Sequence, residues 1–324
     1  MSMPKDSLAK LIRIIDVDIR SVEAIFRSII AQMEEPLSKV LKTSLRGGKR
    51  LRPATVILCG RLFKIPRKRI HILAAAVEVL HSATLIHDDL VDNAVLRRGR
   101  KTVHAVWPVG ATVLAGDYLL AQSVSLVAQL DDPAVLRILA ESLYTMSAGE
   151  IVYHYARKER IKREVYFKSI SAKTASLFAG AMEMVGVLAR AGRSTANRLR
   201  EFGYEFGITY QIVDDILDLV STEKRLGKPV GSDLAQGVVT LPVIVYLERG
   251  NDEKTIRKIL SGKGTARDVK TTIGLIRKSG AIDAALDEAK AHADKSKAAL
   301  SLMPAGKSRQ ALYELIDYII DRKH

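Results

Sequence analysis

The chain has 324 residues, of which 48% are apolar and 27% charged, and its formal net charge at pH 7 is +15. Its single cysteine, Cys59, excludes an internal disulfide, and the modest numbers of Gly and Pro argue against a disordered chain. The longest apolar run, Val238–Leu247, has about ten residues and is shorter than the about 20 that a membrane-spanning helix needs.

The positive charge is compatible with a solvated basic surface, an anionic small substrate, an anionic membrane or a nucleic acid. The basic residues form short clusters rather than one tail, at Arg46–Arg52, Lys64–Arg69, Arg97–Lys101 and Arg157–Arg163. Aromatic residues make up only 5% of the chain, too few for base-stacking surfaces, and no nucleic-acid motif accompanies the clusters. We therefore expect no nucleic-acid partner. Peripheral association with an anionic membrane stays open.

In chain order, the N-terminal segment carries acids through its apolar part, which indicates an amphipathic helix rather than a signal peptide, and we expect a cytoplasmic protein. Apolar residues then recur with helical spacing along most of the chain. Gly and Pro divide the chain into some ten helices joined by short loops. Val238–Tyr246 is ambiguous, although Pro242 disfavours a strand there. We predict an all-α fold, one large helical bundle around a deep central cavity, in a single domain over residues 1–324.

The first basic cluster contains GGKRLRP at Gly47–Pro53. Its glycines can bend the chain into a helix start, where backbone N–H groups favour anions. Gly48, Lys49 and Arg52 are therefore candidates for binding a phosphate group.

The stretch LIHDDLVDNAVLRRG follows at residues 85–99. On a helix, Asp88 and Asp92 project on the same side, and their repulsion destabilises the helix by roughly 0.2–0.5 kcal/mol unless a cation compensates. His81 lies two turns earlier on the same face, so we interpret it as a binding residue. Arg97 and Arg98 follow, and they can bind phosphate in a bidentate manner.

A second DDxxD motif stands in QIVDDILDL, with Asp214 and Asp218 as its carboxylate pair. Both motifs are surrounded by apolar residues, which a solvated acidic face would not be. Oxygen ligands without a His/Cys cluster favour Mg²⁺ over Zn²⁺, and Mg²⁺ commonly binds one or two carboxylates together with substrate phosphates. We predict that the two helices face one another and hold Mg²⁺ ions around one diphosphate.

Further polar residues lie near these motifs in the sequence. Lys173 and Thr174 lie within an apolar helix, where a lysine is costly unless it is paired or reaches solvent. Gln211 comes one turn before Asp214, and Lys228 lies in the loop GKPVGSD after the second motif.

The motifs together resemble the trans-isoprenyl diphosphate synthases, or polyprenyl synthetases. The resemblance runs through GGKRLRP, HSATLIHDDLVDNAVLRRG, GDYLL, the KTA at Lys173, YQIVDDILD and GKPVGSDL…TLP, and it covers about residues 20–320. It implies a helical bundle that usually forms a homodimer. It also implies that an allylic diphosphate ionises and is attacked by isopentenyl diphosphate, after which a proton is lost and the chain is longer by five carbons.

The resemblance assigns roles to individual residues. It implies that Asp88, Asp92, Asp214 and Asp218 bind Mg²⁺, with three ions expected when substrate is bound. Isopentenyl diphosphate would bind to Lys49, Arg52, His81 and Arg98. The allylic partner would be bound or stabilised by Arg97, Lys173, Thr174, Gln211 and Lys228.

The chain departs from the family pattern at two positions. Val238 stands where the family often has the lysine of GKxTLP, and Tyr153 stands where the family often has the glutamine of GExxQ. Neither change affects a predicted metal ligand, so we expect the activity to survive.

Ala83 and Thr84 lie about one turn before Asp88, where short-chain members tend to carry an aromatic plug. Small residues there leave depth of about 5 Å per helical turn for a growing tail, so we predict a product of C30 or longer. A geranylgeranyl diphosphate synthase and a non-catalytic subunit of a heteromer stay as alternatives within the fold. A di-iron oxidase needs two Glu-x-x-His pairs, and we identify only one in this sequence, Glu78–His81. A membrane-surface or nucleic-acid binding module would leave the paired DDxxD motifs unexplained.

Overall fold

The computed structural model describes residues 13–35, 37–45, 47–97, 99–155, 161–222 and 229–322. Within these ranges the chain forms fifteen α-helices, one π-helix and one hairpin of two-residue strands. The first half contains α2 (Asp16–Ala31), α3 (Leu37–Leu45), α4 (Leu51–Leu62), α5 (Arg67–Val91), β1 (Leu96–Arg97), β2 (Arg100–Lys101), α6 (Val109–Ala128) and α7 (Pro133–Tyr155). The second half contains α8 (Arg163–Ile170), η1 (Ser171–Ala175), α9 (Ser176–Leu188), α10 (Arg193–Val220), α12 (Ser232–Ala235), α13 (Leu241–Glu248), α14 (Glu253–Leu260), α15 (Ala266–Lys278), α16 (Ala281–Ser301) and α17 (Lys307–Ile320).

The predicted all-α class is confirmed, and several helices begin directly after a Gly or Pro. Pro66 and Pro108 immediately precede α5 and α6, and Gly192 precedes α10 with a left-handed φ of 79°. The prediction of some ten helices was too low, because short helices add to the number, among them α12, which begins within the predicted loop GKPVGSD. The ambiguous run Val238–Tyr246 is helical from Leu241 on, with Pro242 in the first turn of α13, where its missing N–H costs nothing.

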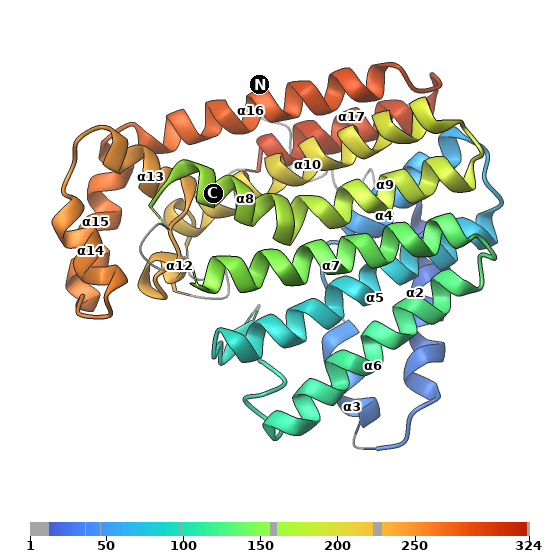
Figure 1. The fold of residues 1–324 in the computed structure, drawn as a ribbon, viewed down its shortest axis with the longest axis horizontal. Helices are drawn as coiled ribbons and strands as arrows, with labels where there is room; N and C mark the ends of the chain where they lie inside the picture. Colours follow the sequence, from blue (N-terminus) through green and yellow to red (C-terminus); the bar gives the residue numbers. More distant parts are fainter. Residues whose placement is uncertain are drawn as a thin grey trace.

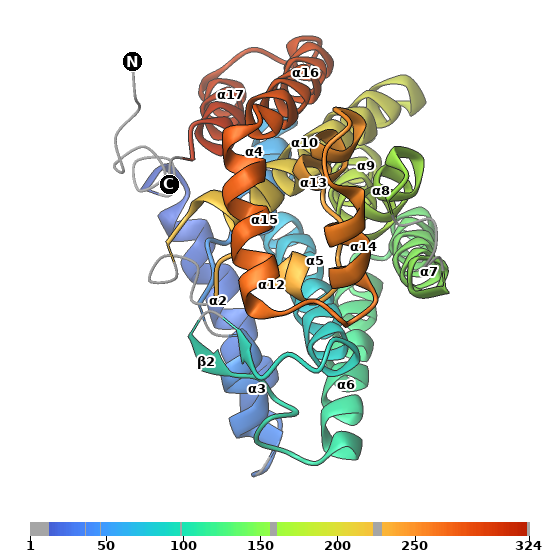
Figure 2. The same cartoon turned by 90° about the vertical axis from the view of Figure 1, so that its left-hand side faces the viewer.

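The longest helices lie side by side in a bundle, and α12 to α15 gather at one end of it (Figures 1 and 2). The most extensive pairings are α9 with α10, α5 with α6, and α10 with α16. Helix α9 is buried around almost its whole circumference. Such burial places the α9 region at the centre of the bundle, next to the helices that carry the two acid motifs.

The N-terminal helix α2 is held to this bundle by a buried ionic cluster. Asp18, with 2% of its side chain exposed, accepts a hydrogen bond from Arg61 of α4 and lies 2.7 Å from Nε2 of His71 of α5. Burial raises the pKa of Asp18, but His71 and Arg61 outweigh burial, and the pKa lies below its ordinary value. The cluster therefore favours the ionised carboxylate and ties three helices together.

Candidate functional site

The first acid motif lies at the C-terminal end of α5. Asp88 is in the last turn of the helix, and Asp92 is the C-terminal cap residue, whose N–H donates to the carbonyl of Asp88 over 2.8 Å. The two residues therefore keep the helical spacing predicted from the sequence. Between them, the buried Asp89 accepts a hydrogen bond of 2.7 Å from Nε of Arg97 on β1. Asp89 thus positions Arg97 beside the motif, while Arg98 lies outside the described residues.

The second acid motif lies in the last two turns of α10. Asp218 is 2% exposed, and its carboxylate accepts hydrogen bonds from Oγ of Ser232 over 3.0 Å and from the N–H of Asp233 over 3.3 Å. Asp214 is more open, with 35% of its side chain exposed, and it pairs with Nη1 of Arg322 at 2.6 Å. The carboxylate of Asp218 is therefore fixed by the chain, whereas that of Asp214 is more open and pairs with Arg322.

The π-helix η1 connects the two acid motifs. Nζ of Lys173 lies 3.2 Å from Oδ2 of Asp88 and 3.2 Å from Oε2 of Glu150 on α7. The next residue, Thr174, donates from Oγ1 to Oε1 of Gln211 on α10 over 2.7 Å. Because Lys173 and Thr174 are adjacent, both acid motifs border the same single turn of chain. The structure thus brings together segments that are far apart in the sequence.

Two features of the local chain produce this arrangement. A π-turn is rare, is found often at functional sites, and rotates the side chains relative to an ordinary helix. Gly207 of α10 faces η1 closely, since a Cβ atom there would lie 2.6 Å from Cα of Ala175. The missing side chain lets α10 approach η1 closely enough for Gln211 to meet Thr174.

The charge of Lys173 is balanced by acids from two helices. Burial lowers the pKa of Lys173, but Asp88, Glu150 and Asp92 outweigh burial, and the net shift raises the pKa above its ordinary value. Lys173 is therefore a fixed cation between the first acid motif and α7. The sequence showed that a lysine in this apolar helix is costly unless it is paired, and the structure shows that it is paired.

A buried relay extends from Thr174 away from the acid motifs. Gln211 donates from Nε2 to Oδ1 of Asp215 over 2.8 Å, and the hydroxyl of Tyr166 donates to Oδ2 of Asp215 over 2.7 Å. Tyr166 and Asp215 are only 3% and 4% exposed. Burial and the charge of Asp233 raise the pKa of Asp215 well above its ordinary value, against the hydrogen bonds from Gln211 and Tyr166. The relay fixes which end of the Gln211 amide faces Thr174.

The basic loop before α4 approaches the second acid motif. Gly47 and Gly48 adopt left-handed φ values of 82° and 93°, which favour glycine. Lys49 lies 6.0 Å from the ring centre of Tyr318, and the guanidinium of Arg52 lies 4.6 Å from that of Phe178.

Tyr210 links this loop to Asp214. Burial and the charge of Asp214 raise the pKa of Tyr210 to about 12, while Arg322 and Arg52 act in the opposite direction. Arg52 and Asp214 therefore act on one and the same phenol, which is consistent with a shared anion site.

Arg50, in the same loop, has a structural role. It donates to Glu23 over 2.7 Å, to Glu78 over 2.9 Å and to the carbonyl of Leu45 over 2.5 Å. Because Glu78 is held by Arg50, the Glu78–His81 pair is not available as a di-iron ligand pair, which removes the basis for the oxidase alternative.

The remaining predicted residues on α5 differ in their surroundings. His81 and Thr84 are half-buried, and the Thr84 hydroxyl donates to the carbonyl of His81 over 2.9 Å. Ala83 is 1% exposed and belongs to the packed core. The hydroxyl of Thr84 is thus turned to its own helix, so both small residues present a short side chain one turn before the metal motif.

The donors present suit a hard divalent cation. Asp88, Asp92, Asp214 and Asp218 offer only carboxylate oxygens, the ligands that Mg²⁺ prefers. Within the described ranges, no three His, Cys, Asp or Glu side chains lie close enough together to hold a metal by themselves. The carboxylates therefore fit metals whose coordination is completed by water and substrate oxygens, as is usual for Mg²⁺.

The two departures from the family pattern are structurally mild. The half-buried Tyr153 acts electrostatically on Tyr166, so its phenol lies near the buried relay. The N–H of Val238 donates to the carbonyl of Asp233 over 2.8 Å, which anchors the loop without a basic side chain. Lys228, the other cation expected in this region, lies outside the described residues.

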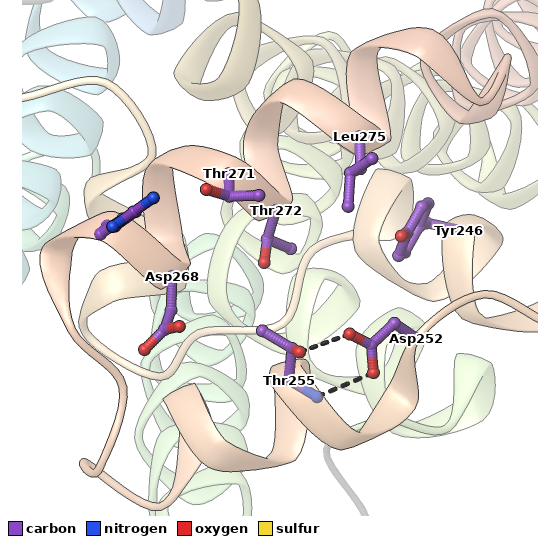
Figure 3. A pocket seen from close by; sticks show the side chains of 8 residues that line it. Tyr246, Asp252, Thr255, Asp268, Thr271, Thr272 and Leu275 are labelled. Carbon is purple, nitrogen blue, oxygen red and sulfur yellow. Dashed lines mark hydrogen bonds between the residues drawn. The ribbon is translucent and has the colours of Figure 1, made fainter.

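Figure 3 shows a separate pocket of about 170 Å³ between α13, α14 and α15. The carboxylate of Asp252 there accepts hydrogen bonds from the N–H and hydroxyl of Thr255 and so caps α14. No predicted site residue lines the pocket, and two of its acids, Asp252 and Asp268, take part in helix capping.

Sequence reasoning missed four residues of the site: Glu150, Tyr166, Asp215 and Arg322. Glu150 had been noted only as part of the GExxQ-like motif, and Asp215 only as the middle acid of DDxxD. Nothing in the sequence pointed to Tyr166 or Arg322, because their contacts span 49 and 108 residues.

Comparisons with known proteins agree with this geometry. Residues 34–276 match the family model described as polyprenyl synthetase. The heptaprenyl diphosphate synthase component 2 of Bacillus subtilis is 35% identical over 95% of this chain and 88% of its own length. The nonaprenyl diphosphate synthase of Mycobacterium tuberculosis is 33% identical over 93% of this chain and 91% of its own. A Caulobacter crescentus polyprenyl synthase, solved with calcium and isoprenyl diphosphate, superposes with a TM-score of 0.89 at 34% identity, covering 99% of this chain and 100% of its own.

Proposed function

The chain belongs to the polyprenyl synthetase family, and from this premise we propose that its two acid motifs hold an allylic diphosphate through Mg²⁺ while its basic loop holds isopentenyl diphosphate. The chain is a prenyltransferase, a polyprenyl diphosphate synthase of the long-chain type. The alternative of a geranylgeranyl diphosphate synthase is less favoured, since the curated relatives named above make heptaprenyl and nonaprenyl products.

One observation carries the assignment of the site. Lys173 contacts Asp88, and its neighbour Thr174 contacts Gln211, one turn from Asp214 and Asp215. Two carboxylate motifs and a fixed lysine therefore border one space, which is the arrangement that a metal-bound diphosphate requires.

The residues divide the reaction between them. Mg²⁺ would neutralise the leaving diphosphate when bound. We propose three ions with substrate. Lys173 and Arg97 contact the diphosphate oxygens and stabilise the negative charge that develops as the C–O bond breaks. Thr174 and Gln211 present fixed dipoles near the resulting allylic cation.

The second substrate completes the bond. Lys49, Arg52 and His81 bind the diphosphate of isopentenyl diphosphate and hold its C=C bond against the cation. The π electrons form the new C–C bond, and the departing diphosphate accepts the proton that is lost. We assign the same substrate contact to Arg98, and a contact with the allylic diphosphate to Lys228.

We propose a homodimer formed through α6. Val113, Leu114 and Val124 are exposed on one face of α6, and Leu114 is 67% exposed. The apolar stretch of α6 is 39% buried, whereas the apolar stretch of α5 is 72% buried. By length and composition alone, both helices could cross a membrane. A second copy of the chain would cover this stripe. A different partner subunit, as the name of the Bacillus subtilis relative implies for that protein, is the alternative that a mass measurement separates.

We also propose a cytoplasmic enzyme that associates peripherally with anionic membrane. The substrates are water-soluble diphosphates, whereas the product is strongly apolar. Cys59 is fully buried, and burial raises the pKa of its thiol, so it is an unreactive core residue rather than half of a disulfide.

The test is to incubate the purified protein with labelled isopentenyl diphosphate, an allylic primer and Mg²⁺, and to size the extracted lipid by chromatography. We expect Mg²⁺-dependent formation of a C30 or longer product. Asp88→Asn should abolish it, while the control Asp287→Asn, at an exposed position on α16, should not. Absence of any elongated lipid at saturating substrate contradicts the proposal.

A further inference from the structure

The end of the bundle opposite the acid motifs is built from four connections, at residues 63–66, 129–132, 189–192 and 302–306 (Figure 1, right). Helices α5 and α10 begin at this end and run to the acid motifs near their C-terminal ends. A product that is held by its diphosphate at the acid motifs, and whose tail runs back along these helices, would extend toward this end. We call this surface the basal end.

The basal end is strongly basic. Its connections and the first helical turns after them contain eight cationic residues and two acids. The cations are Lys64, Arg67, Lys68, Arg69, Arg190, Arg193, Lys307 and Arg309, and the acids are Asp131 and Asp132. The first turn of α2, which packs against α4 and α5 at this end, adds Asp16 and Asp18, and both are paired with cations. The whole chain has 51 basic and 36 acidic residues, so the basal end is more one-sided than the protein as a whole.

Most of these cations are exposed and lack an acidic partner. Arg69 and Arg309 donate to backbone carbonyls of neighbouring loops. The other six are exposed, and none of them forms an ion pair with an acidic side chain within the described ranges. One of the two acids is also engaged, since Asp132 accepts a hydrogen bond from the N–H of Ala134.

The helix directions add to the positive potential. Helices α5, α7, α10 and α17 all begin at the basal end, and none has an acidic residue in its first turn. Helix N-termini carry partial positive charge and are stabilised by acids, not bases. Arg67, Arg193 and Lys307 are nevertheless the first residues of three of these helices. The folded chain alone gains nothing from this placement, whereas an anionic surface outside the protein would.

A groove of about 750 Å³ opens at this end between α7, α9 and α10. Its floor is apolar, with Ile138, Val187 and Ala196, and three arginines stand among its lining residues, namely Arg137, Arg190 and Arg193. One acid, Glu183, is also among the lining residues and pairs with Arg200 at 2.6 Å, while Glu141 beside the groove pairs with Arg137 at 2.8 Å. Arg190 and Arg193 are the lining arginines that form no ion pair within the described ranges. An apolar floor bordered by arginines suits an anionic phospholipid, because its acyl chain is apolar and its phosphate is negatively charged.

We propose that the basal end docks on a bilayer containing anionic phospholipid, with the arginines of the groove at headgroup level. The inference rests on the proposed function in one respect, because it explains how an apolar product leaves the enzyme. Helix α5 has 25 residues, which corresponds to about 37 Å at 1.5 Å per residue. A tail of seven five-carbon units spans roughly 30–35 Å at carbon–carbon bond lengths near 1.5 Å. A heptaprenyl tail therefore reaches from the acid motifs to the basal end, where it can pass into the bilayer.

The test is flotation of the full chain with phosphatidylcholine vesicles, with and without one third phosphatidylglycerol. The test variant carries Arg67→Glu, Arg193→Glu and Lys307→Glu. The matched control carries Lys263→Glu, Lys270→Glu and Lys278→Glu, three exposed positions on and before α15. Both variants change the net charge equally. In the test variant the new carboxylates stand at helix N-termini, where they favour the helix, so a folding defect is not expected.

We expect the wild type to float with the anionic vesicles only, and salt to weaken this binding. The test variant should bind at least about tenfold more weakly than the wild type. The control should bind within about twofold of the wild type. Anionic vesicles should also raise the detergent-free turnover of the wild type but not of the test variant, because release of a long product can limit turnover.

Equal loss in both variants, equal binding to uncharged vesicles, or no binding by the wild type would overturn the proposal. Tighter binding to duplex DNA than to vesicles at the same salt concentration would overturn it too. Failure of the proposed function is distinguishable, because it appears as absent turnover in detergent, where docking is not needed.

Discussion

The buried relay behind Gln211 gives the sharpest prediction, which concerns Tyr166→Phe. The change removes only the hydroxyl that donates to Oδ2 of Asp215 over 2.7 Å. Both side chains are almost fully buried, so water cannot replace the donor. Leaving one oxygen of a buried carboxyl without its donor costs about 1–3 kcal/mol of folding free energy. Asp215 then holds the Gln211 amide less firmly, and the dipole at Thr174 is less well fixed.

If about 1.4 kcal/mol of this loss falls on the transition state, kcat decreases roughly tenfold while the KM for isopentenyl diphosphate changes little. The assay is steady-state incorporation of labelled isopentenyl diphosphate, with thermal unfolding measured in parallel. Tyr246→Phe is the matched control, since Tyr246 is 4% exposed and lies in the pocket of Figure 3, which no site residue lines. We expect the control to lose stability without losing kcat. A Tyr166→Phe enzyme that is destabilised but fully active would refute the positioning role.

Three further predictions follow from other parts of the chain. Ala83→Tyr should shorten the main product by several five-carbon units, because a large ring then stands one turn before the metal motif; chromatography that finds an unchanged long product refutes this. Leu114→Asp should weaken dimerisation by about 3 kcal/mol, roughly a hundredfold in Kd, because it puts a charge into an apolar interface, and light scattering should then report the monomer mass. Asp18→Asn should lower the free energy of unfolding by roughly 3 kcal/mol at pH 7, because it breaks the buried cluster with Arg61 and His71. Since the folded pKa of Asp18 is depressed, the stabilisation is present above about pH 4 and is lost as the pH falls further, so urea unfolding should show the gap to wild type closing in acid; a constant gap contradicts the ionic origin.

The local properties of the site were readable from the sequence. Helical spacing placed Asp88 with Asp92 and Asp214 with Asp218, and the structure keeps both pairs near helix ends. Glycines marked the left-handed turn before α4. These features depend on neighbours within a few residues, so composition and spacing are sufficient to predict them.

The lysine at 173 shows where sequence reasoning stopped. Its position in an apolar helix indicated that the side chain is paired, reaches solvent or reaches a diphosphate, but the sequence named no partner. The structure pairs it with Asp88 and Glu150, which come from two other helices. No local pattern records that pairing, because it depends on the π-turn of η1 and on the close approach that Gly207 permits.

The sequence by itself determined the all-helical class, the positions of the acid pairs and the family, because helix periodicity and short motifs are properties of contiguous residues. Only the tertiary structure decided that Tyr166 and Arg322 belong to the site, and that four helix N-termini and eight cations collect at one end of the bundle. The physical reason is that packing brings together groups from distant segments, and the energy of burying or exposing their charges depends on that packing rather than on their order in the chain.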